Sequence, residues 1–234
     1  MKKFFKFLLL LILIAVLSVS AIVIYEGHEM YQQAIAKTSI QEAVEKIQNS
    51  KNYIDEKQVP DDFAHAIVAV EDRRFYKHPG IDIISIGRAV VTDIKNMALV
   101  EGGSTITQQL AKNMYFSQEK KFARKVAEVF VAFDLEKQYS KEEILNLYLN
   151  VIYFGDGHYG LKEASYGYFN KAPNALSLYE ITLLAGLPNA PSAYALSENE
   201  DLAIERQNMV IAAMQRNGYL TEEQVTSLKA KQPK

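Results

Sequence analysis

The chain has 234 residues, of which 49% are hydrophobic and 23% charged, a composition that supports one sizeable core and excludes a disordered protein. The formal net charge of −2 argues against bulk electrostatic attraction to nucleic acid. Because the chain has no cysteine, disulfides, thiol catalysis and thiolate metal sites are excluded. Four scattered histidines without an HExxH motif also argue against a zinc enzyme.

The N-terminus has the pattern of a membrane anchor. Three lysines precede an apolar run over residues 7–24. As a helix this run is about 27 Å long, close to the hydrocarbon thickness of a bilayer. Because basic residues stay in the cytoplasm, we expect a cytoplasmic tail at residues 1–6 and a transmembrane anchor at residues 7–25, with the rest outside. A cleavable signal peptide is the alternative, since Val19-Ser20-Ala21 resembles a cleavage site.

The segment after the anchor has a different composition. Residues 26–59 are polar and helix-prone, with apolar residues at roughly helical spacing. We therefore expect a stalk or linker helix here, and a globular domain over residues 60–234.

The first cluster of chemically notable residues lies at 71–80 (EDRRFYKHPG). The apolar residues before it predict a helix over residues 61–73, with an aspartate after Pro60 as its cap. Carboxylates at Glu71 and Asp72 would then face the negative end of the helix dipole, which is unfavourable unless cations or a ligand offset it. A surface pair of acid and arginine is the alternative interpretation.

A second helix is expected to follow this cluster. Asp82 can cap it, and apolar residues run along it from Ile83 to Val100. Such a surface is either buried in the core or forms an interfacial segment that enters the membrane.

The second cluster lies at 101–113 (EGGSTITQQLAKN). Thr105 and Gln108 have the spacing of a capping box and predict the start of a helix after the two glycines. Gln109 and Lys112 fall on the same stripe of this helix as Thr105. A helix N-terminus followed by a lysine suits a phosphate-bearing ligand, although a solvated face would have the same pattern.

The third cluster lies at 120–130 (KKFARKVAEVF) and begins a long predicted helix. Its expected core face consists of Phe122, Val126, Val129, Phe130 and Phe133. Arg124 and Glu128 are four residues apart, the spacing of a simple salt bridge. A carboxylate that enters an apolar stripe beside an arginine is also typical of catalytic sites.

Together the three clusters resemble the signature motifs of the peptidoglycan glycosyltransferases. Two further matches follow in order, at residues 140–155 and 184–192 (LAGLPNAPS). The resemblance implies a mainly α fold, with a lysozyme-like lobe and a smaller membrane-proximal lobe after one N-terminal transmembrane helix. Capping boxes that begin at Ser140, Ser177 and Thr221 agree with such a fold. An SxxK match at Ser117 lacks the companion motifs of a transpeptidase, so we expect the monofunctional form.

The resemblance also implies an activity. Relatives transfer a glycan strand, linked to undecaprenyl pyrophosphate, onto the acceptor hydroxyl of lipid II with inversion. Glu71 matches their catalytic base, and Glu128 matches a second essential carboxylate whose role, donor positioning or metal contact, stays open. Lys112, Lys120 and Arg124 are expected to neutralise the departing pyrophosphate. The positions expected to bind substrate are Asp72, Phe75, His78, Thr105, Gln109, Lys112, Lys120 and Arg124.

The resemblance implies partners and a location as well. No cofactor is expected to be required, but Mg²⁺ or Mn²⁺ at the pyrophosphate is left open, with Glu128 as the candidate ligand. Expected partners are lipid II, the undecaprenyl-pyrophosphate-linked glycan, the membrane and other cell-wall synthesis proteins, but not nucleic acid. The protein is expected to be single-pass in the cell membrane with its N-terminus in the cytoplasm. A membrane-anchored lysozyme-like hydrolase and a non-catalytic cell-wall scaffold are the alternatives.

Overall fold

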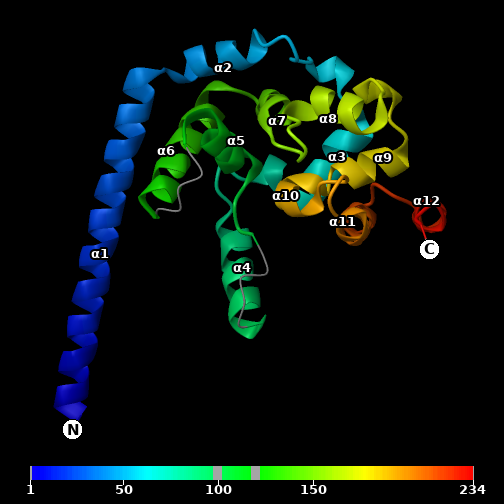
Figure 1. Cartoon of the computed structure of the whole chain (residues 1–234). Coiled ribbons are helices and arrows are strands. Elements are labelled where there is room, and N and C mark those ends of the chain that lie inside the picture. Colours follow the sequence, from blue (N-terminus) through cyan, green and yellow to red (C-terminus); the bar gives the residue numbers. More distant parts are fainter. Residues whose placement is uncertain (1, 97–101, 117–121, 234) are drawn as a thin grey trace.

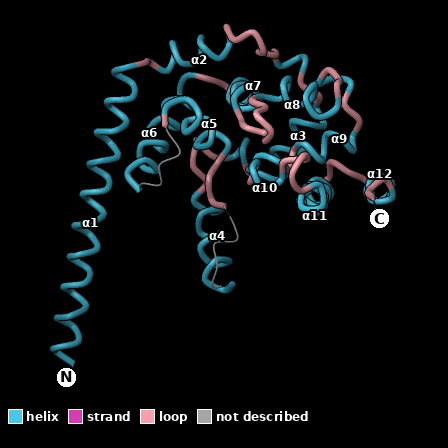
Figure 2. Tube along the Cα trace, in the orientation of Figure 1, coloured by secondary structure: helices cyan, strands magenta, loops and turns pink. Residues whose placement is uncertain are grey.

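The fold is mainly α, as predicted (Figures 1 and 2). The computed structural model describes residues 2–96, 102–116 and 122–233, and all regular secondary structure within these ranges is helical. The α-helices are α1 (Lys2–Lys37), α2 (Ile40–Gln48), α3 (Asp61–Glu71), α4 (Ile83–Asn96), α5 (Ile106–Tyr115), α6 (Phe122–Gln138), α7 (Lys141–Val151), α8 (Gly160–Phe169), α9 (Leu178–Leu184), α10 (Pro191–Tyr194), α11 (Glu200–Arg216) and α12 (Glu222–Ala230). Four 3₁₀ turns connect them, at η1 (Glu56–Gln58), η2 (Phe75–Lys77), η3 (Pro173–Ala175) and η4 (Leu187–Asn189).

Helix α1 has two different surroundings. Up to Tyr25 its side chains are largely exposed, and by length and composition the helix could cross a membrane. Beyond Tyr25 the same helix continues and packs along α6. A methyl group on Gly27 would come within 2.7 Å of the Ala123 carbonyl oxygen, so the two helices are in very close contact. Tyr31 donates a hydrogen bond to Asp134 and lies 5.4 Å from the ring of Phe130.

The residues predicted as a stalk are helical and lie against the body. They form the end of α1, then α2 and the turn η1. Ile40 and Val44 of α2 belong to the same buried cluster as the rest of the domain. The segment is therefore packed as part of the body in this structure.

Helix α3 differs from the prediction at both ends. It begins at Asp61 after Pro60, which makes no side-chain cap, so the expected aspartate cap is wrong. Asp61 instead lies in the first turn, where its charge still favours the helix dipole. The helix ends at Glu71, two residues early, because Asp72 leaves the helix to contact groups elsewhere.

One hydrophobic core holds the body together, and it buries the large side chains of several helices. Fully buried members include Phe63, Ile67, Phe75, Ile106, Leu110, Leu135, Tyr148 and Phe154. Helices α3 and α5 each contribute a buried pair four residues apart, Phe63 with Ile67 and Ile106 with Leu110.

The predicted core face of α6 is wrong. Phe122 is 85% exposed, and the residues of α6 that are buried are Ala123, Ala127, Glu128, Val131, Ala132 and Leu135. Helix α6 lies between α1 and the core, so it is apolar on two sides. Phe130 packs toward α1, and the small alanines on the other side permit close packing. Periodicity alone could not separate these two faces.

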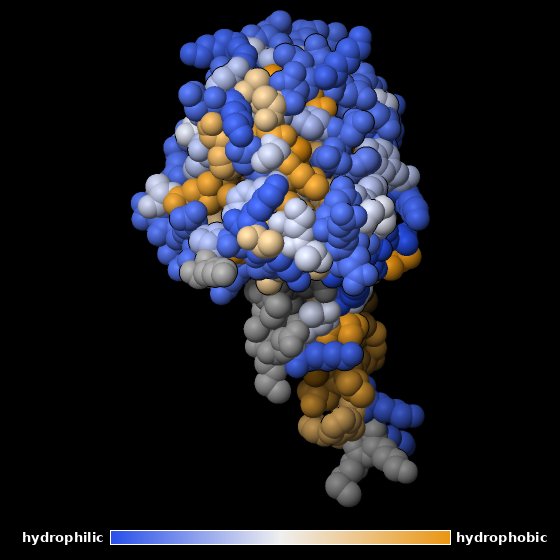
Figure 3. All heavy atoms as spheres, turned by 90° about the vertical axis from the view of Figure 1, so that its right-hand side faces the viewer, coloured by the Kyte–Doolittle hydropathy of each residue, from blue (hydrophilic) through white to orange (hydrophobic). Residues whose placement is uncertain are grey.

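Helix α4 begins as predicted but is not covered by the core. Asp82 caps it by accepting hydrogen bonds from the backbone N–H groups of Ile84 at 3.0 Å and Ser85 at 3.1 Å. Ile83 and Ile84 are 74% and 58% exposed, so the core-burial alternative is wrong for them. In Figure 3 the body is mainly blue, whereas the part below it, which contains both α1 and α4, is largely orange. The end of the predicted apolar run, residues 97–100, lies outside the described residues.

Candidate active site

A cleft of about 550 Å³ lies where α3, α4, α5, α6 and α11 meet. Its charged lining residues are Glu71, Asp72, Arg73, Asp82, Arg88, Lys112, Arg124, Lys125, Glu128, Arg206 and Arg216. Seven of these are basic and four acidic, so the cleft is positive although the chain as a whole carries −2. A cleft with this balance favours an anionic ligand.

Glu71 is held at the end of α3 by two donors. Its side chain is 7% exposed, and it accepts a hydrogen bond from the Gln109 side-chain amide at 2.9 Å. Arg206 of α11 approaches its other oxygen at 3.4 Å. The buried Tyr148 hydroxyl donates to the Gln109 carbonyl oxygen at 3.2 Å, which turns the Gln109 amide toward Glu71. Burial, and the nearby charges of Glu71 and Asp72, raise the pKa of Tyr148 well above 10, so its hydroxyl remains a donor.

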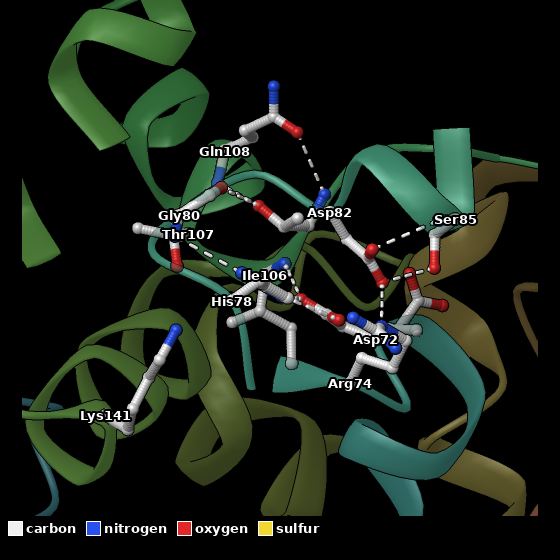
Figure 4. Close-up of polar contacts among 12 residues, drawn as sticks. Asp72, Arg74, His78, Gly80, Asp82, Ser85, Ile106, Thr107, Gln108 and Lys141 are labelled. Carbon is white, nitrogen blue, oxygen red and sulfur yellow. Dashed lines mark hydrogen bonds and ion pairs between the residues drawn. The ribbon is translucent and has the colours of Figure 1, made fainter. Parts of the chain in front are cut away.

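Asp72 connects the first cluster to the second. It contacts His78 Nε2 at 2.9 Å and accepts a hydrogen bond from the Ile106 N–H at 3.1 Å (Figure 4). The N–H of Gly80 donates to His78 Nδ1 at 3.2 Å, so the proton of the neutral ring lies on Nε2, facing Asp72. The Thr105 hydroxyl donates to the Gly80 carbonyl at 2.6 Å. These contacts tie the loop after Glu71 to the start of α5.

The residues expected to bind substrate therefore fall into two groups. Gln109, Lys112 and Arg124 line the cleft, as do Asp72 and Thr105 at its base. Phe75 and His78 are buried behind the cleft wall and do not line it, and Lys141 covers the Phe75 ring at 4.4 Å. Their positions favour a supporting role over contact with a ligand. Lys120 lies outside the described residues.

Glu128 lies at the cationic end of the cleft. Its side chain is 1% exposed, and its oxygens lie 3.0 Å from Arg124 Nε and 2.8 Å from Lys125 Nζ. Lys125 also donates to the Ser104 hydroxyl at 2.6 Å. Burial, followed by the charge of Arg124, lowers the pKa of Lys112. An anion that enters here would relieve the repulsion between these cations.

The residues do not form a metal site by themselves. Among the described residues no group of three or more His, Asp or Glu side chains is placed to hold a metal ion. Both oxygens of Glu128, the candidate ligand, already face cations. A metal ion at Glu128 would have to compete with Arg124 and Lys125 for these oxygens.

A second hollow of about 500 Å³ adjoins the cleft. The two share Gln109 and Lys112 as a common wall. The far side of the second hollow carries Tyr153 and Tyr159, whose ring centres are 4.6 Å apart, and the polar side chain of Asn113. Aromatic rings beside amide groups suit the alternating apolar and hydroxyl faces of sugars.

The sequence analysis missed Arg206. It lies 135 positions after Glu71 along the chain, on a helix in which no functional motif was noted. The sequence contained one indication of its role, because the helical spacing places Arg206 on the same stripe of α11 as Ala203 and Val210, which are buried. A charged residue on a buried stripe often has a specific partner.

The fold and the cleft define a helical protein with one N-terminal helix that could cross a membrane and a positively charged cleft beside a buried carboxylate. Residues 37–215 match the family model described as transglycosylase, and the chain belongs to this family. Penicillin-binding protein 1F of Bacillus subtilis is 45% identical over 170 residues, which cover 73% of this chain and 24% of that protein. Penicillin-binding protein 1A of Escherichia coli is 42% identical over 167 residues, or 71% of this chain and 20% of that protein.

The chain spans about a quarter or less of the length of these curated relatives. A crystal structure of penicillin-binding protein 1A from Haemophilus influenzae aligns at 23% identity with a TM-score of 0.47, over 77% of this chain and 17% of that one. The family resemblance drawn from the five motifs is confirmed. The monofunctional form stays a prediction.

Proposed function

We propose that the protein is a peptidoglycan glycosyltransferase that polymerises lipid II. The observation that carries this proposal is the placement of Glu71 in one cleft with Lys112, Arg124 and Lys125. The reaction needs a base for an acceptor hydroxyl and cations for a departing pyrophosphate. Family membership supports the same reaction class.

The transfer step follows from this geometry. The acceptor hydroxyl of lipid II attacks C1 of the donor sugar and gives its proton to Glu71. The bond from C1 to the pyrophosphate oxygen breaks with inversion, and its electron pair leaves with undecaprenyl pyrophosphate. Lys112 and Arg124 stabilise the charge that develops on this leaving group. Gln109 and Arg206 hold the Glu71 carboxylate in place for the proton transfer.

The second hollow gives the donor strand a place next to the reacting bond. Its aromatic pair, Tyr153 and Tyr159, offers apolar faces to the sugar rings, and Asn113 offers an amide to their hydroxyls. A pyrophosphate bound at Lys112, on the shared wall, would lie between the strand and Glu71.

The membrane parts fit a lipid-linked substrate. We propose that α1 is an uncleaved anchor, with the N-terminus in the cytoplasm and the cleft on the outer side. In Figure 1, α4 projects from the body in the same direction as the N-terminal part of α1, and its exposed residues Ile83, Ile84 and Ile86 would enter the same leaflet. N-terminal sequencing of membrane-extracted protein tests the anchor, because a mature chain that begins near Ile22 would identify a cleaved signal.

A hydrolase is less well supported. Hydrolysis by a lysozyme-like enzyme needs a second carboxyl group that donates a proton to the leaving oxygen. Glu128 is the available candidate, but Arg124 and Lys125 engage it on both sides. The cluster is better suited to a phosphate than to an uncharged glycosidic oxygen.

The proposal is tested by incubating the detergent-solubilised chain with labelled lipid II and resolving the products on a gel. A ladder of glycan strands is expected. A parallel incubation with preformed strands separates the alternatives. Shortening of these strands without growth from lipid II would identify a hydrolase, and no change in either substrate would favour a scaffold.

A further inference from the structure

A third hollow, of about 400 Å³, lies where the end of α1 meets α2. The C-terminal half of α5 and the last turn of α7 form its other walls, through Tyr115 and Val151. The reaction proposed above does not use this hollow. In Figure 1 the junction of α1 and α2 lies at the opposite end of α1 from the N-terminus, and therefore away from the proposed membrane side.

The third hollow continues the path that begins at Glu71. The cleft and the second hollow share Gln109 and Lys112, and the second and third hollows share Asn113. The opposite wall is also continuous. Asn150 and Val151 line the third hollow, and the next residues along the chain, Ile152 and Tyr153, line the second. From Gln109 to Tyr115 the path advances roughly 9 Å along α5. A strand that extends from the reacting bond through the second hollow would therefore reach the third.

The lining of the third hollow is suited to an anionic, hydroxyl-rich ligand. It contains Lys37 and Lys46 but no carboxylate among the residues that the structure describes. Neither lysine forms an ion pair within 4 Å in the described part of the chain. The buried hydroxyl of Tyr115, which lines the hollow, has no hydrogen-bond partner among the described residues. Such a hydroxyl gains a hydrogen bond when a polar ligand enters.

We infer that the third hollow is a subsite for the elongated product, in which Lys37 and Lys46 bind the carboxylates of the peptides on the glycan strand and Tyr115 binds a sugar or peptide polar group. The inference rests on the proposed function. A subsite at this distance holds strands that have already grown past the second hollow. It therefore acts on how long a strand stays bound between transfers, and has little effect on the first transfer.

The test compares a charge-reversed variant, Lys37→Glu/Lys46→Glu, with a matched control, Lys51→Glu/Lys57→Glu. All four lysines are exposed, and the control pair lies outside the hollow, so both variants change the net charge equally. Two quantities are measured for each protein: the length distribution of strands made from lipid II, and the affinity for soluble peptide-bearing glycan strands before and after their carboxylates are converted to amides. Tyr115→Phe, which removes the hydroxyl alone, is a third variant.

We expect the charge-reversed variant to make shorter strands while its initial rate of coupling two lipid II molecules stays within about twofold of wild type. Its affinity for peptide-bearing strands should fall about fivefold or more, the scale of two modest charge contacts. The amidated strands should bind wild type and the charge-reversed variant alike, because they lack the negative charges of the carboxylates. Tyr115→Phe should weaken binding of both strand types.

Two results would overturn the inference. One is unchanged product length and affinity in the charge-reversed variant, and the other is an equal loss in the control pair. If wild type itself makes no strands from lipid II, the proposed function fails first, and the binding measurement still decides whether the hollow binds peptide-bearing glycan.

Discussion

The carboxylate of Asp72 accepts a hydrogen bond from the backbone N–H of Ile106 at 3.1 Å, so the residue next to Glu71 caps the first turn of α5. Helix α5 carries Gln109, which donates to Glu71 at 2.9 Å. One buried contact thus fixes the position of the Gln109 helix relative to the Glu71 helix. Asp72 thereby positions the proposed base although it is not the base itself.

This arrangement predicts that Asp72→Asn destabilises the fold. His78 Nε2 contacts both oxygens of Asp72, and Oδ2 also accepts from the Ile106 N–H, so in asparagine one of the two oxygen positions becomes an NH2 group that faces a buried donor. The expected loss is about 1–3 kcal/mol in the free energy of unfolding, measured by urea titration. The exposed cap Asp55→Asn is the control and should change stability by under about 0.5 kcal/mol, because asparagine also caps well. Equal effects of the two changes would contradict the positioning role of Asp72.

The cationic end of the cleft predicts a selective loss of turnover. Lys112→Met and Arg124→Met should each cost roughly 2–4 kcal/mol of transition-state stabilisation, about 30- to 1,000-fold in kcat/KM on lipid II. Lys137→Met, which removes a 72% exposed lysine of the same helix as Arg124, should leave the rate near wild type. All three variants should bind a pyrophosphate-free glycan with nearly the same affinity as wild type. If that binding falls as steeply as turnover, the cations contact the sugars or hold the fold.

The lowered pKa of Lys112 predicts a pH dependence. Burial and the charge of Arg124 hold this pKa below 10.5, so the lysine loses its charge at a lower pH than an exposed lysine. Affinity for inorganic pyrophosphate should therefore fall as pH rises through the lowered pKa, and Lys112→Met should lack this decline. At pH values between the lowered pKa and 10.5, Lys112 is protonated to a greater extent in the unfolded chain than in the folded chain. The contribution of Lys112 to the free energy of unfolding therefore rises with pH in this range. Calorimetric titration of wild type and Lys112→Met at several pH values checks the prediction, and parallel curves would refute it.

The contact between α1 and α6 predicts a sensitive position at Gly27. A side chain there would begin 2.5 Å from Val126 Cβ, so the helices must separate. Gly27→Leu should lower the free energy of unfolding by about 1–3 kcal/mol, the usual cost of overpacking. Gln33→Leu on the exposed side of α1 is the control and should be nearly neutral. Thermal unfolding in detergent distinguishes the two, and an unchanged Gly27→Leu would mean that α1 does not pack on α6 in solution.

Local signals in the sequence predicted the helix starts well. Capping boxes at Thr105, Ser140, Ser177 and Thr221 are all formed as expected. A capping box needs only residues three apart, so no distant contact is required to predict it. A local signal also marks the end of α11, because Gly218, just after its C-cap, has a φ of +78°, a conformation that glycine adopts without strain.

Contacts between distant segments could not be predicted in the same way. The periodicity of apolar residues predicts which face of a helix is apolar, but not which other helix covers that face. For this reason Phe122 was wrongly placed in the core, and the contact of Arg206 with Glu71 was not predicted. The motifs identified Glu71 and Gln109 separately, but nothing in the sequence indicated that their side chains form a hydrogen bond. The resemblance to a family supplied the site, and the structure shows that Asp72 and His78 connect its parts.

In the proposed reaction Glu71 takes the proton of the acceptor hydroxyl. Glu71→Gln keeps the size of the side chain but cannot accept that proton, so the rate of strand growth from lipid II should fall by about 10²- to 10⁴-fold. The affinity for pyrophosphate should stay close to wild type, because the cations are untouched. The variant should still fold, although its unfolding temperature should fall by a few degrees because the amide can accept from only one of the two donors, Gln109 and Arg206. A loss of less than about tenfold, with the fold intact, would remove Glu71 from the role of base.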